Sequence, residues 1–192
     1  MLPLILASTS LYRRELLARL PLPFQCAAPD VDEAPLPAES HPDRAVRLAL
    51  AKAAAVGARH PDATVIGSDQ VGVCKGELLD KPGDALRARS QLQWLSAAAA
   101  TFHTAVAVLQ VERGNILQFV DTTTVYFRAL SDAEIERYIA IDKPFDCAGG
   151  FRCEALGITL FSRVVSEDPT GLIGLPLIAV ARALRQLGYQ LP

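Results

Sequence analysis

The stretch Leu2-Pro3-Leu4-Ile5-Leu6-Ala7-Ser8-Thr9-Ser10, residues 2–10, indicates the fold class because it passes directly from an apolar run into a polar loop. A short run without polar side chains is typical of a strand that is buried on both faces. The segment that follows carries Leu16, Leu17 and Leu20 at helical spacing. This order of strand, loop and helix predicts a domain in which helices cover a sheet.

The same alternation continues along the chain. Further elements are expected as strands at 24–27 and 64–73, helices at 43–58 and after Asp84, and a long antiparallel hairpin at 104–111 and 116–127. Ser131 and Glu134 match the capping box of another helix, and a last helix should begin at Pro176. The expected fold is a single α/β domain over 1–192, a mixed twisted sheet flanked by helices, in which the 104–128 hairpin could form a smaller lobe.

The composition limits the class of protein and of partner. With 51% hydrophobic and 21% charged residues among 192, the chain can form one well-packed soluble domain. A formal net charge of −2 gives no general attraction to nucleic acid polymers, so any phosphate chemistry needs a local group of cations. The longest uncharged apolar stretch, 171–181, is much shorter than the roughly 18 residues of a membrane span.

The cysteines indicate a reducing compartment. The four cysteines form no C-x-x-C pair, and the three histidines lie far from them in sequence, so a zinc site is not expected. The short apolar run at the N-terminus is followed, not preceded, by basic residues, unlike a secretory signal. Free thiols and a cytoplasmic location are therefore expected.

Arg13 and Arg14 lie where a helix usually carries acidic residues. The N-terminal end of a helix is partially positive, so cations in its first turn are disfavoured by up to about 1 kcal/mol. A bound phosphate would reverse this effect, and the hydroxyl residues at 8–10 in the preceding loop would support such a site. The alternative is that both arginines only pair with surface carboxylates.

Lys52 and Asp69 are charged residues at positions where apolar side chains are expected. Lys52 falls in the middle of the apolar stripe of its helix. Either it extends past small alanines to solvent, or it reaches a buried anion or a ligand. Asp69 follows the apolar start of a strand, and ligands of open α/β sheets bind at the carboxyl ends of strands. The alternative for Asp69 is the capping of a neighbouring loop.

Several ordered motifs resemble the Maf family, and the resemblance spans nearly the whole chain. They are Leu4-Ile5-Leu6-Ala7-Ser8-Thr9-Ser10, Arg13-Arg14-Glu15-Leu16-Leu17, Val31-Asp32-Glu33, Lys52, Gly67-Ser68-Asp69, Lys81-Pro82 and Gly174-Leu175-Pro176-Leu177. The resemblance implies a mixed α/β fold related to that of inosine-triphosphate pyrophosphatases. It also implies a hydrolase that uses a divalent metal, Mg²⁺ or Mn²⁺, to split nucleoside triphosphates into monophosphate and pyrophosphate.

The positions within these motifs imply roles for individual residues. Asp69 resembles the family's proton acceptor. The residues that resemble its phosphate-binding and metal-binding set are Ser8, Arg13, Lys52 and Lys81 for phosphate, and Glu33 with Asp69 for metal. An ordinary aspartate is a weak base at neutral pH, so we expect Asp69 chiefly to hold the metal and to orient water for attack on the α-phosphorus. Related proteins suggest a homodimer.

Tyr12, Gln70 and Glu154 resemble the specificity residues of the branch that acts on 7-methyl-GTP. The branch that acts on dTTP and UTP typically has arginine, threonine and glutamine at these places. A 7-methylguanine ring is cationic, and an aromatic face together with a carboxylate suits a cation. The predicted function is a house-cleaning pyrophosphatase for 7-methyl-GTP, with a dTTP/UTP pyrophosphatase as the alternative.

Three residues depart from the family pattern. Leu11 replaces a proline, which should alter only helix initiation. Asp80 replaces a glycine and could pair with Lys81, which would weaken the hold of Lys81 on phosphate. Gly171 replaces an asparagine, so contacts of that loop with the base are left unassigned. Asp80 keeps open a further alternative, a nucleotide-binding regulator of cell division with vestigial hydrolysis.

Overall fold

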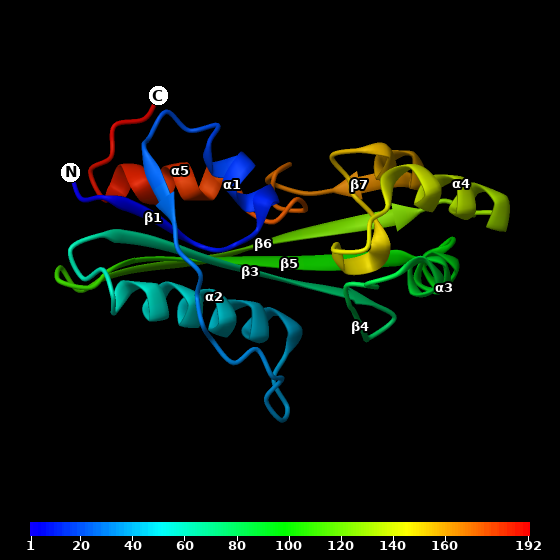
Figure 1. Ribbon diagram of the computed structural model, residues 1–192, viewed down its shortest axis with the longest axis horizontal. Coiled ribbons are helices and arrows are strands. Elements are labelled where there is room, and N and C mark those ends of the chain that lie inside the picture. Colours follow the sequence, from blue (N-terminus) through cyan, green and yellow to red (C-terminus); the bar gives the residue numbers. More distant parts are fainter. The chain divides into compact units, whose positions relative to one another are not determined.

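The computed structural model describes all 192 residues and shows the expected α/β arrangement (Figure 1). Its elements are β1 (Leu4–Ala7), α1 (Leu11–Leu17), β2 (Phe24–Cys26), α2 (His41–Gly57), β3 (Thr64–Cys74), β4 (Glu77–Leu79), α3 (Ala85–Leu95), β5 (Ala99–Gln110), β6 (Asn115–Phe127), α4 (Asp132–Asp142), β7 (Phe161–Val165) and α5 (Leu177–Gln186), with 3-10 turns at Ala148–Gly150 and Leu156–Leu160.

Every expected helix and strand is present, and β5 starts earlier than the sequence pattern predicts. The pattern does not predict β4 or β7. Strand β4 has only three residues, and β7 is exposed along most of its length, so neither shows the alternation of buried and exposed residues that marks a strand. No helix is both long and apolar enough to cross a membrane.

The sheet is mixed, as the hairpin predicts. Its strands follow the order β2-β1-β3-β5-β6-β7, with β4 paired to β3. Strand β1 is parallel to β2 and β3, whereas β4 and β7 are antiparallel to their neighbours. The register pairs Ala7 with Gly67, so the chain leaves β1 at Ser8 beside the segment Gly67-Ser68-Asp69.

The chain forms two compact units, and the long strands β3, β5 and β6 contribute residues to both. Unit 1 comprises Met1–Gln70, His103–Asp121 and Asp168–Pro192, and unit 2 comprises Val71–Phe102 and Thr122–Glu167. The hairpin expected at 104–128 is thus divided between the units at Asp121.

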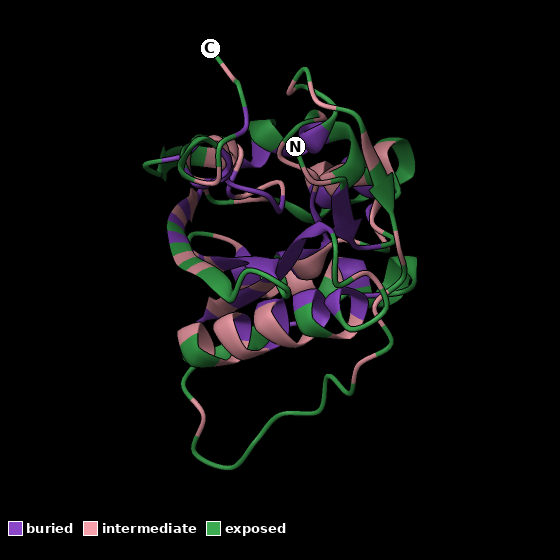
Figure 2. Ribbon diagram, turned by 90° about the vertical axis from the view of Figure 1, so that its left-hand side faces the viewer, coloured by how far each residue is buried: buried purple, intermediate pink, exposed green.

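In unit 1, helices cover both faces of the sheet (Figure 1). Helices α1 and α5 lie on one face, where their leucines pack with β1, β3 and β5 in a core that includes Leu6, Leu16, Ile66 and Leu184. Helix α2 lies on the other face, and its buried residues follow one side of the helix (Figure 2). Full burial of a leucine or isoleucine side chain contributes about 1.5–3 kcal/mol to stability.

In unit 2, four phenylalanine rings pack against one another. Phe151 stacks edge-on against Phe102, Phe127 and Phe161 with ring centroids 5.5, 5.4 and 5.2 Å apart. Edge-to-face pairs add about 0.5–1.5 kcal/mol each beyond the burial of their area.

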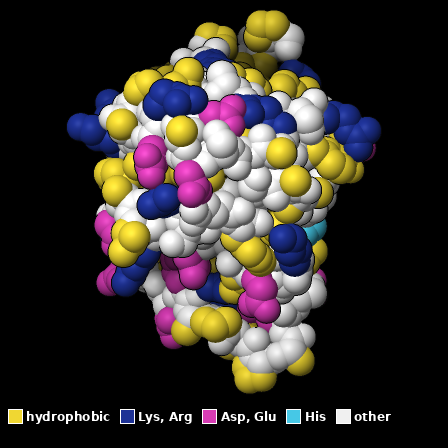
Figure 3. All heavy atoms as spheres, turned by 90° about the vertical axis from the view of Figure 1, so that its right-hand side faces the viewer, with side chains coloured by type: hydrophobic (Ala, Val, Ile, Leu, Met, Phe, Trp, Pro, Cys, Tyr) yellow, Lys and Arg dark blue, Asp and Glu magenta, His cyan; other side chains and the backbone are white.

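On the face of the molecule in Figure 3, basic and acidic side chains are interspersed, with no continuous area of one sign.

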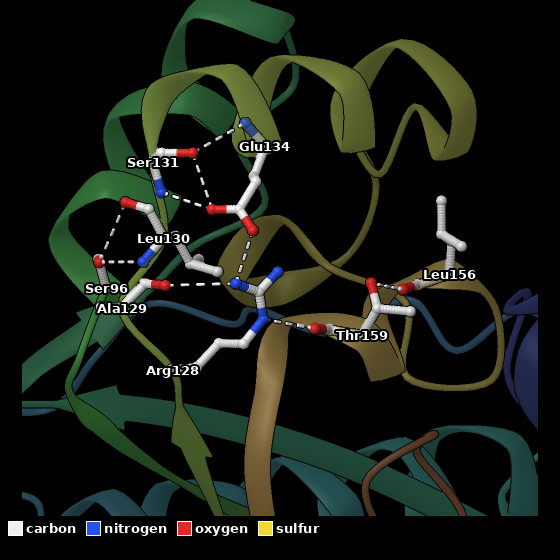
Figure 4. Close-up of polar contacts among 8 residues, drawn as sticks. All are labelled: Ser96, Arg128, Ala129, Leu130, Ser131, Glu134, Leu156 and Thr159. Carbon is white, nitrogen blue, oxygen red and sulfur yellow. Dashed lines mark hydrogen bonds and ion pairs between the residues drawn. The ribbon is translucent and has the colours of Figure 1, made fainter.

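Helix α4 begins with the capping box that the sequence predicts (Figure 4). The Ser131 side chain accepts from the Glu134 N–H at 3.4 Å, and the Glu134 carboxylate accepts from the Ser131 N–H at 2.8 Å. Arg128 also donates to Glu134 at 2.7 Å and to the Thr159 carbonyl at 2.8 Å. Bonds from the Ser131 backbone, the Ser131 hydroxyl and Arg128 lower the pKa of Glu134 from 4.5 to about 2.

This low pKa predicts a specific dependence of stability on pH. Between about pH 4.5 and 2 the unfolded chain takes up a proton at Glu134 before the folded chain does, so stability falls as the pH falls through this window. Glu134→Gln keeps the capping box but removes the titrating charge. We expect its melting temperature to fall less steeply than that of the wild type from pH 4.5 to 2. Parallel slopes in thermal melts would contradict this interpretation.

Candidate active site

A buried lysine joins two carboxylates in unit 1. The Lys52 ammonium lies 2.7 Å from Asp69 Oδ1 and 2.7 Å from Glu33 Oε1. The side chains of Lys52 and Asp69 are 8% and 10% exposed, whereas that of Glu33 is 57% exposed. Of the two alternatives for Lys52, the structure therefore shows contact with a buried anion. The three charged groups thus form a small site in which the side chains of Lys52 and Asp69 are buried and that of Glu33 is exposed to solvent.

Close packing of α2 on β3 brings Lys52 to Asp69. A Cβ atom on Gly67 would lie 2.2 Å from the Ala49 carbonyl oxygen and 2.6 Å from the Ala53 nitrogen. Only glycine allows helix and strand to approach this closely. Lys52 lies on the inward stripe of α2, between these two alanines in sequence, and its ammonium reaches Asp69 Oδ1 at 2.7 Å.

Arg13 and Ser68 share one acceptor, the carbonyl of Gly174. Arg13 Nε donates to it at 2.9 Å and Ser68 Oγ at 3.0 Å. Burial lowers the pKa of Arg13, while the charges of Asp69 and Glu33 oppose this shift. The guanidinium is thus close enough to the two carboxylates to interact with them. Its Nε anchors the side chain, and such an anchored fork is suited to binding an anion.

The serines of the loop between β1 and α1 hold its shape. Ser8 is 6% exposed, and its hydroxyl accepts from the Ser10 N–H at 3.1 Å. Ser10 is the N-cap of α1 and accepts from the Arg13 N–H at 3.4 Å. Leu11, which replaces the usual proline, is the first residue of α1 and is 66% exposed. Tyr12 follows it and is half-buried.

The Gln70 side chain binds the loop before α5. Its Nε2 donates to the carbonyls of Gly171 and Leu172 at 3.1 and 3.0 Å and to Thr104 Oγ1 at 2.9 Å. The Gly171 carbonyl also accepts from Thr104 Oγ1 at 2.9 Å. These bonds fix the amide nitrogen of Gln70, a residue that resembles a specificity determinant, to the backbone of unit 1.

Asp168 and Thr170 order the same loop, and the sequence analysis did not identify them. Asp168 is 4% exposed and accepts from the N–H groups of Ile178 and Thr170 at 2.7 and 3.0 Å. Thr170 Oγ1 accepts from the Leu177 N–H at 2.8 Å. Together they satisfy the first N–H groups of α5. The signal in the sequence was the Asp-Pro-Thr segment shortly before a helix that starts at a proline.

Gly171 lies close to the side chain of Asp121. A Cβ atom on Gly171 would lie 2.1 Å from Asp121 Oδ2, so an asparagine cannot replace it unless Asp121 moves. Asp121 is itself 9% exposed. A larger residue at position 171 would thus require the Asp121 side chain to shift.

Two residues of the candidate set belong to unit 2. Lys81 is exposed in the turn that follows β4. The backbone carbonyl of its neighbour Asp80 accepts from the Gly149 N–H at 3.3 Å, which fixes the start of this turn. Glu154 is exposed and lies 3.3 Å from Arg152 Nε. Burial and the charge of Glu154 raise the pKa of the adjacent Cys153 to about 12, so this thiol is protonated at neutral pH.

Glu33 and Asp69 bring two carboxylate oxygens to the ammonium of Lys52. No group of three or more His, Cys, Asp or Glu side chains gathers into a complete protein-only metal site. Mg²⁺ is usually held by one or two carboxylates together with substrate phosphates and water. Two carboxylate oxygens that both lie 2.7 Å from one cation are therefore a suitable donor set for such an ion.

Comparison with known proteins agrees with the motifs. The family described as Maf-like protein matches residues 3–187. A 7-methyl-GTP pyrophosphatase of Aromatoleum aromaticum is 55% identical over 189 residues, which cover 98% of this chain and 97% of that protein. One of Xanthomonas axonopodis pv. citri is 55% identical over 98% of both chains, and one of Thiobacillus denitrificans is 51% identical over 96% of this chain and 92% of its own. The chain belongs to the Maf family.

Proposed function

We propose that the protein is a nucleoside triphosphate pyrophosphatase that hydrolyses 7-methyl-GTP to 7-methyl-GMP and pyrophosphate. The observation that carries this proposal is the contact of Lys52 with both Asp69 and Glu33, 2.7 Å to each. Phosphoryl chemistry needs cations and carboxylates fixed beside each other, and relatives at 51–55% identity over nearly their whole length are named for this activity.

The residues of unit 1 divide the work by charge. Asp69 orients the water that attacks the α-phosphorus, and its burial holds the carboxylate in one place. Lys52 and Arg13 balance the negative charge that grows on the phosphate oxygens, and Ser8 binds phosphate from the loop after β1. By the family resemblance, Lys81 is proposed as a further phosphate-binding residue. Preorganised cations of this kind contribute several kcal/mol to transition-state stabilisation.

A divalent cation, Mg²⁺ or Mn²⁺, is the proposed cofactor, with Glu33 and Asp69 as its protein ligands. When bound, it would polarise a phosphate oxygen and neutralise part of the triphosphate charge. The donor set of two carboxylates supports this choice, because the remaining positions can be taken by water and phosphate oxygens.

The methylated base is matched by the chemistry of three residues. Methylation at N7 makes guanine cationic, and Tyr12 offers an aromatic face for which cation–π stacking contributes about 0.5–2 kcal/mol. The carboxylate of Glu154 can accept charge-assisted hydrogen bonds from the base edge. Gln70 lies in β3 and holds the loop before α5 through its Nε2. These three residue types support 7-methyl-GTP over dTTP and UTP.

The proposal is tested with a panel of nucleoside triphosphates and pyrophosphate release as the readout. We expect the wild type to prefer 7-methyl-GTP over GTP, dTTP and UTP, and to lose activity in EDTA and regain it with Mg²⁺ or Mn²⁺. Glu154→Gln, which keeps the size of the side chain but removes its charge, should lower kcat/KM for 7-methyl-GTP by about tenfold or more, the equivalent of 1.4 kcal/mol.

Other triphosphates serve as internal controls in this panel. Turnover of dTTP and UTP by Glu154→Gln should not fall, because these neutral pyrimidine bases lack both the positive charge of 7-methylguanine and its donor edge. Preference of the wild type for dTTP or UTP would assign the protein to the other branch. Tight nucleotide binding without any product would instead identify a regulator that has lost hydrolysis.

We further propose that the enzyme acts in the cytoplasm as a homodimer. The four free cysteines support a reducing compartment, since none is used in a disulfide. The dimer is supported by the family resemblance.

A further inference from the structure

Glu33 lies in a segment that has no helix or strand to hold it. The segment 28–40 between β2 and α2 is exposed along most of its length (Figure 2). Its Glu33 carboxylate nevertheless lies 2.7 Å from a lysine whose side chain is only 8% exposed. An exposed segment with few buried apolar contacts is the part of a structure that opens most easily. Helix α2 contacts this segment through Arg44, whose Nη2 donates to the Glu33 carbonyl at 3.2 Å, and through Arg47.

Arg47 of α2 makes three such contacts with one guanidinium. Its Nε lies 2.5 Å from Glu39 Oε1, and its Nη2 lies 2.8 Å from Glu39 Oε2. The same Nη2 donates to the carbonyl of Ala34 at 3.1 Å. Ala34 directly follows Glu33, and Glu39 directly precedes the N-cap of α2. Arg47 thus grips the segment at two points that enclose residues 34–39.

Glu39 is the anchored end of this arrangement. Its side chain is 10% exposed, in contrast to the exposed residues before it. The hydrogen bond from Arg47 is the main cause that lowers the pKa of Glu39. Glu39 also accepts from the Leu36 N–H at 3.4 Å, and its own N–H donates to the Leu36 carbonyl at 3.3 Å. The residues between Ala34 and Glu39 therefore form a turn.

We propose that Arg47 is a positioning residue for the hydrolysis reaction. We use the term clamp for the bonds from Arg47 to Glu39 and to Ala34. This clamp holds the Glu33 carboxylate beside Lys52 and Asp69. This inference rests on the proposed function. A lysine at this position could not replace the clamp fully, because a single ammonium lacks the planar fork that spans a carboxylate bidentately.

The first test measures the segment directly and needs no activity. In Arg47→Met we expect faster amide hydrogen exchange at 34–39 than in the wild type, with exchange in the second half of α2 unchanged. Arg59→Met is the matched control, because Arg59 donates to the Ala28 carbonyl of the same segment at 2.6 Å but lies outside the clamp. This control should leave exchange at 34–39 unchanged. Equal exchange in Arg47→Met and the wild type would overturn the proposal.

The second test asks whether the clamp acts through Glu33. A misplacement of about 1 Å far from the chemistry can cost about 100-fold in rate, so we expect kcat/KM to fall at least tenfold in Arg47→Met. Glu33→Gln should fall further, and Arg47→Met should add little in the Glu33→Gln background. Losses that multiply in the double variant would show that Arg47 acts independently of Glu33 and would overturn the proposal.

Arg47→Lys is the control for misfolding, because it keeps the positive charge on α2 and changes only the geometry of the donor groups. It should recover part of the activity lost in Arg47→Met, and an activity no better than that of the methionine variant at equal folding would contradict a clamp. If the wild type hydrolyses no triphosphate, the proposed function fails, whereas hydrogen exchange still decides whether the clamp holds the segment.

Discussion

Asp69→Asn should lose nearly all turnover while it keeps its fold. The amide has the size of the carboxylate, so the packing around β3 is preserved, but it can neither accept a proton nor hold a divalent cation well. If Asp69 holds the metal and orients the water as proposed, the variant loses an interaction of a kind that contributes several kcal/mol to transition-state stabilisation. We therefore expect kcat to fall at least 100-fold at saturating substrate and metal. Lys52 keeps its contact with Glu33 at 2.7 Å, which limits the loss of stability.

The matched control for this variant is Asp62→Asn. Asp62 is an exposed carboxylate shortly before β3, so the same chemical change there removes only a surface charge. Its kcat should equal that of the wild type, and circular dichroism should show that both variants are folded. An unchanged kcat in Asp69→Asn would remove Asp69 from the centre of the site.

Lys52→Met should cause the largest loss of stability. Methionine fills the space of the lysine stem, but the Asp69 carboxylate, in a residue that is 7% exposed, loses its closest cation. Breaking a buried ion pair by removing one partner typically costs about 3–5 kcal/mol. Glu33 is 57% exposed and can be solvated instead, so the cost arises mainly from Asp69. Urea denaturation of the metal-free protein measures this loss.

The double variant Lys52→Met with Asp69→Asn separates the charge effect from packing. If the cost comes from an unpaired buried carboxylate, Asp69→Asn should stabilise the Lys52→Met protein although it does not stabilise the wild type. Such a reversal of sign is the mark of direct coupling between two residues. Losses that simply add in the double variant would mean that the stem of Lys52, not its ammonium, carries the contribution.

The sequence predicts the fold well because its signals are local. The capping box at Ser131, the N-cap at Asp84 and the apolar stripe of α2 each act within a few residues, and all appear in the structure. The inward position of Lys52 also follows from helical periodicity alone. The contacts of Lys52 with its two partners do not follow from periodicity. The contact with Asp69 depends on the approach of α2 to Gly67, and the contact with Glu33 depends on the clamp from Arg47.

The residues that sequence reasoning missed act through the backbone. Asp168 and Thr170 bind N–H groups at the start of α5, and Arg47 binds a carbonyl of the Glu33 segment. Such contacts depend on which loops lie next to each other in the fold. The spacing of residues in the sequence does not predict this arrangement. Gly171 shows the same limit, since Asp121, the residue that a side chain there would meet, lies far from it in sequence.

Hydrolysis of 7-methyl-GTP by the wild type in ¹⁸O-labelled water tests the central claim most directly. If the site around Asp69 directs water to the α-phosphorus, the bond between that phosphorus and the bridging oxygen breaks and pyrophosphate leaves. Mass spectrometry should then find the label in 7-methyl-GMP and none in pyrophosphate. Labelled pyrophosphate, release of orthophosphate with 7-methyl-GDP, or no hydrolysis at all would contradict the proposed reaction.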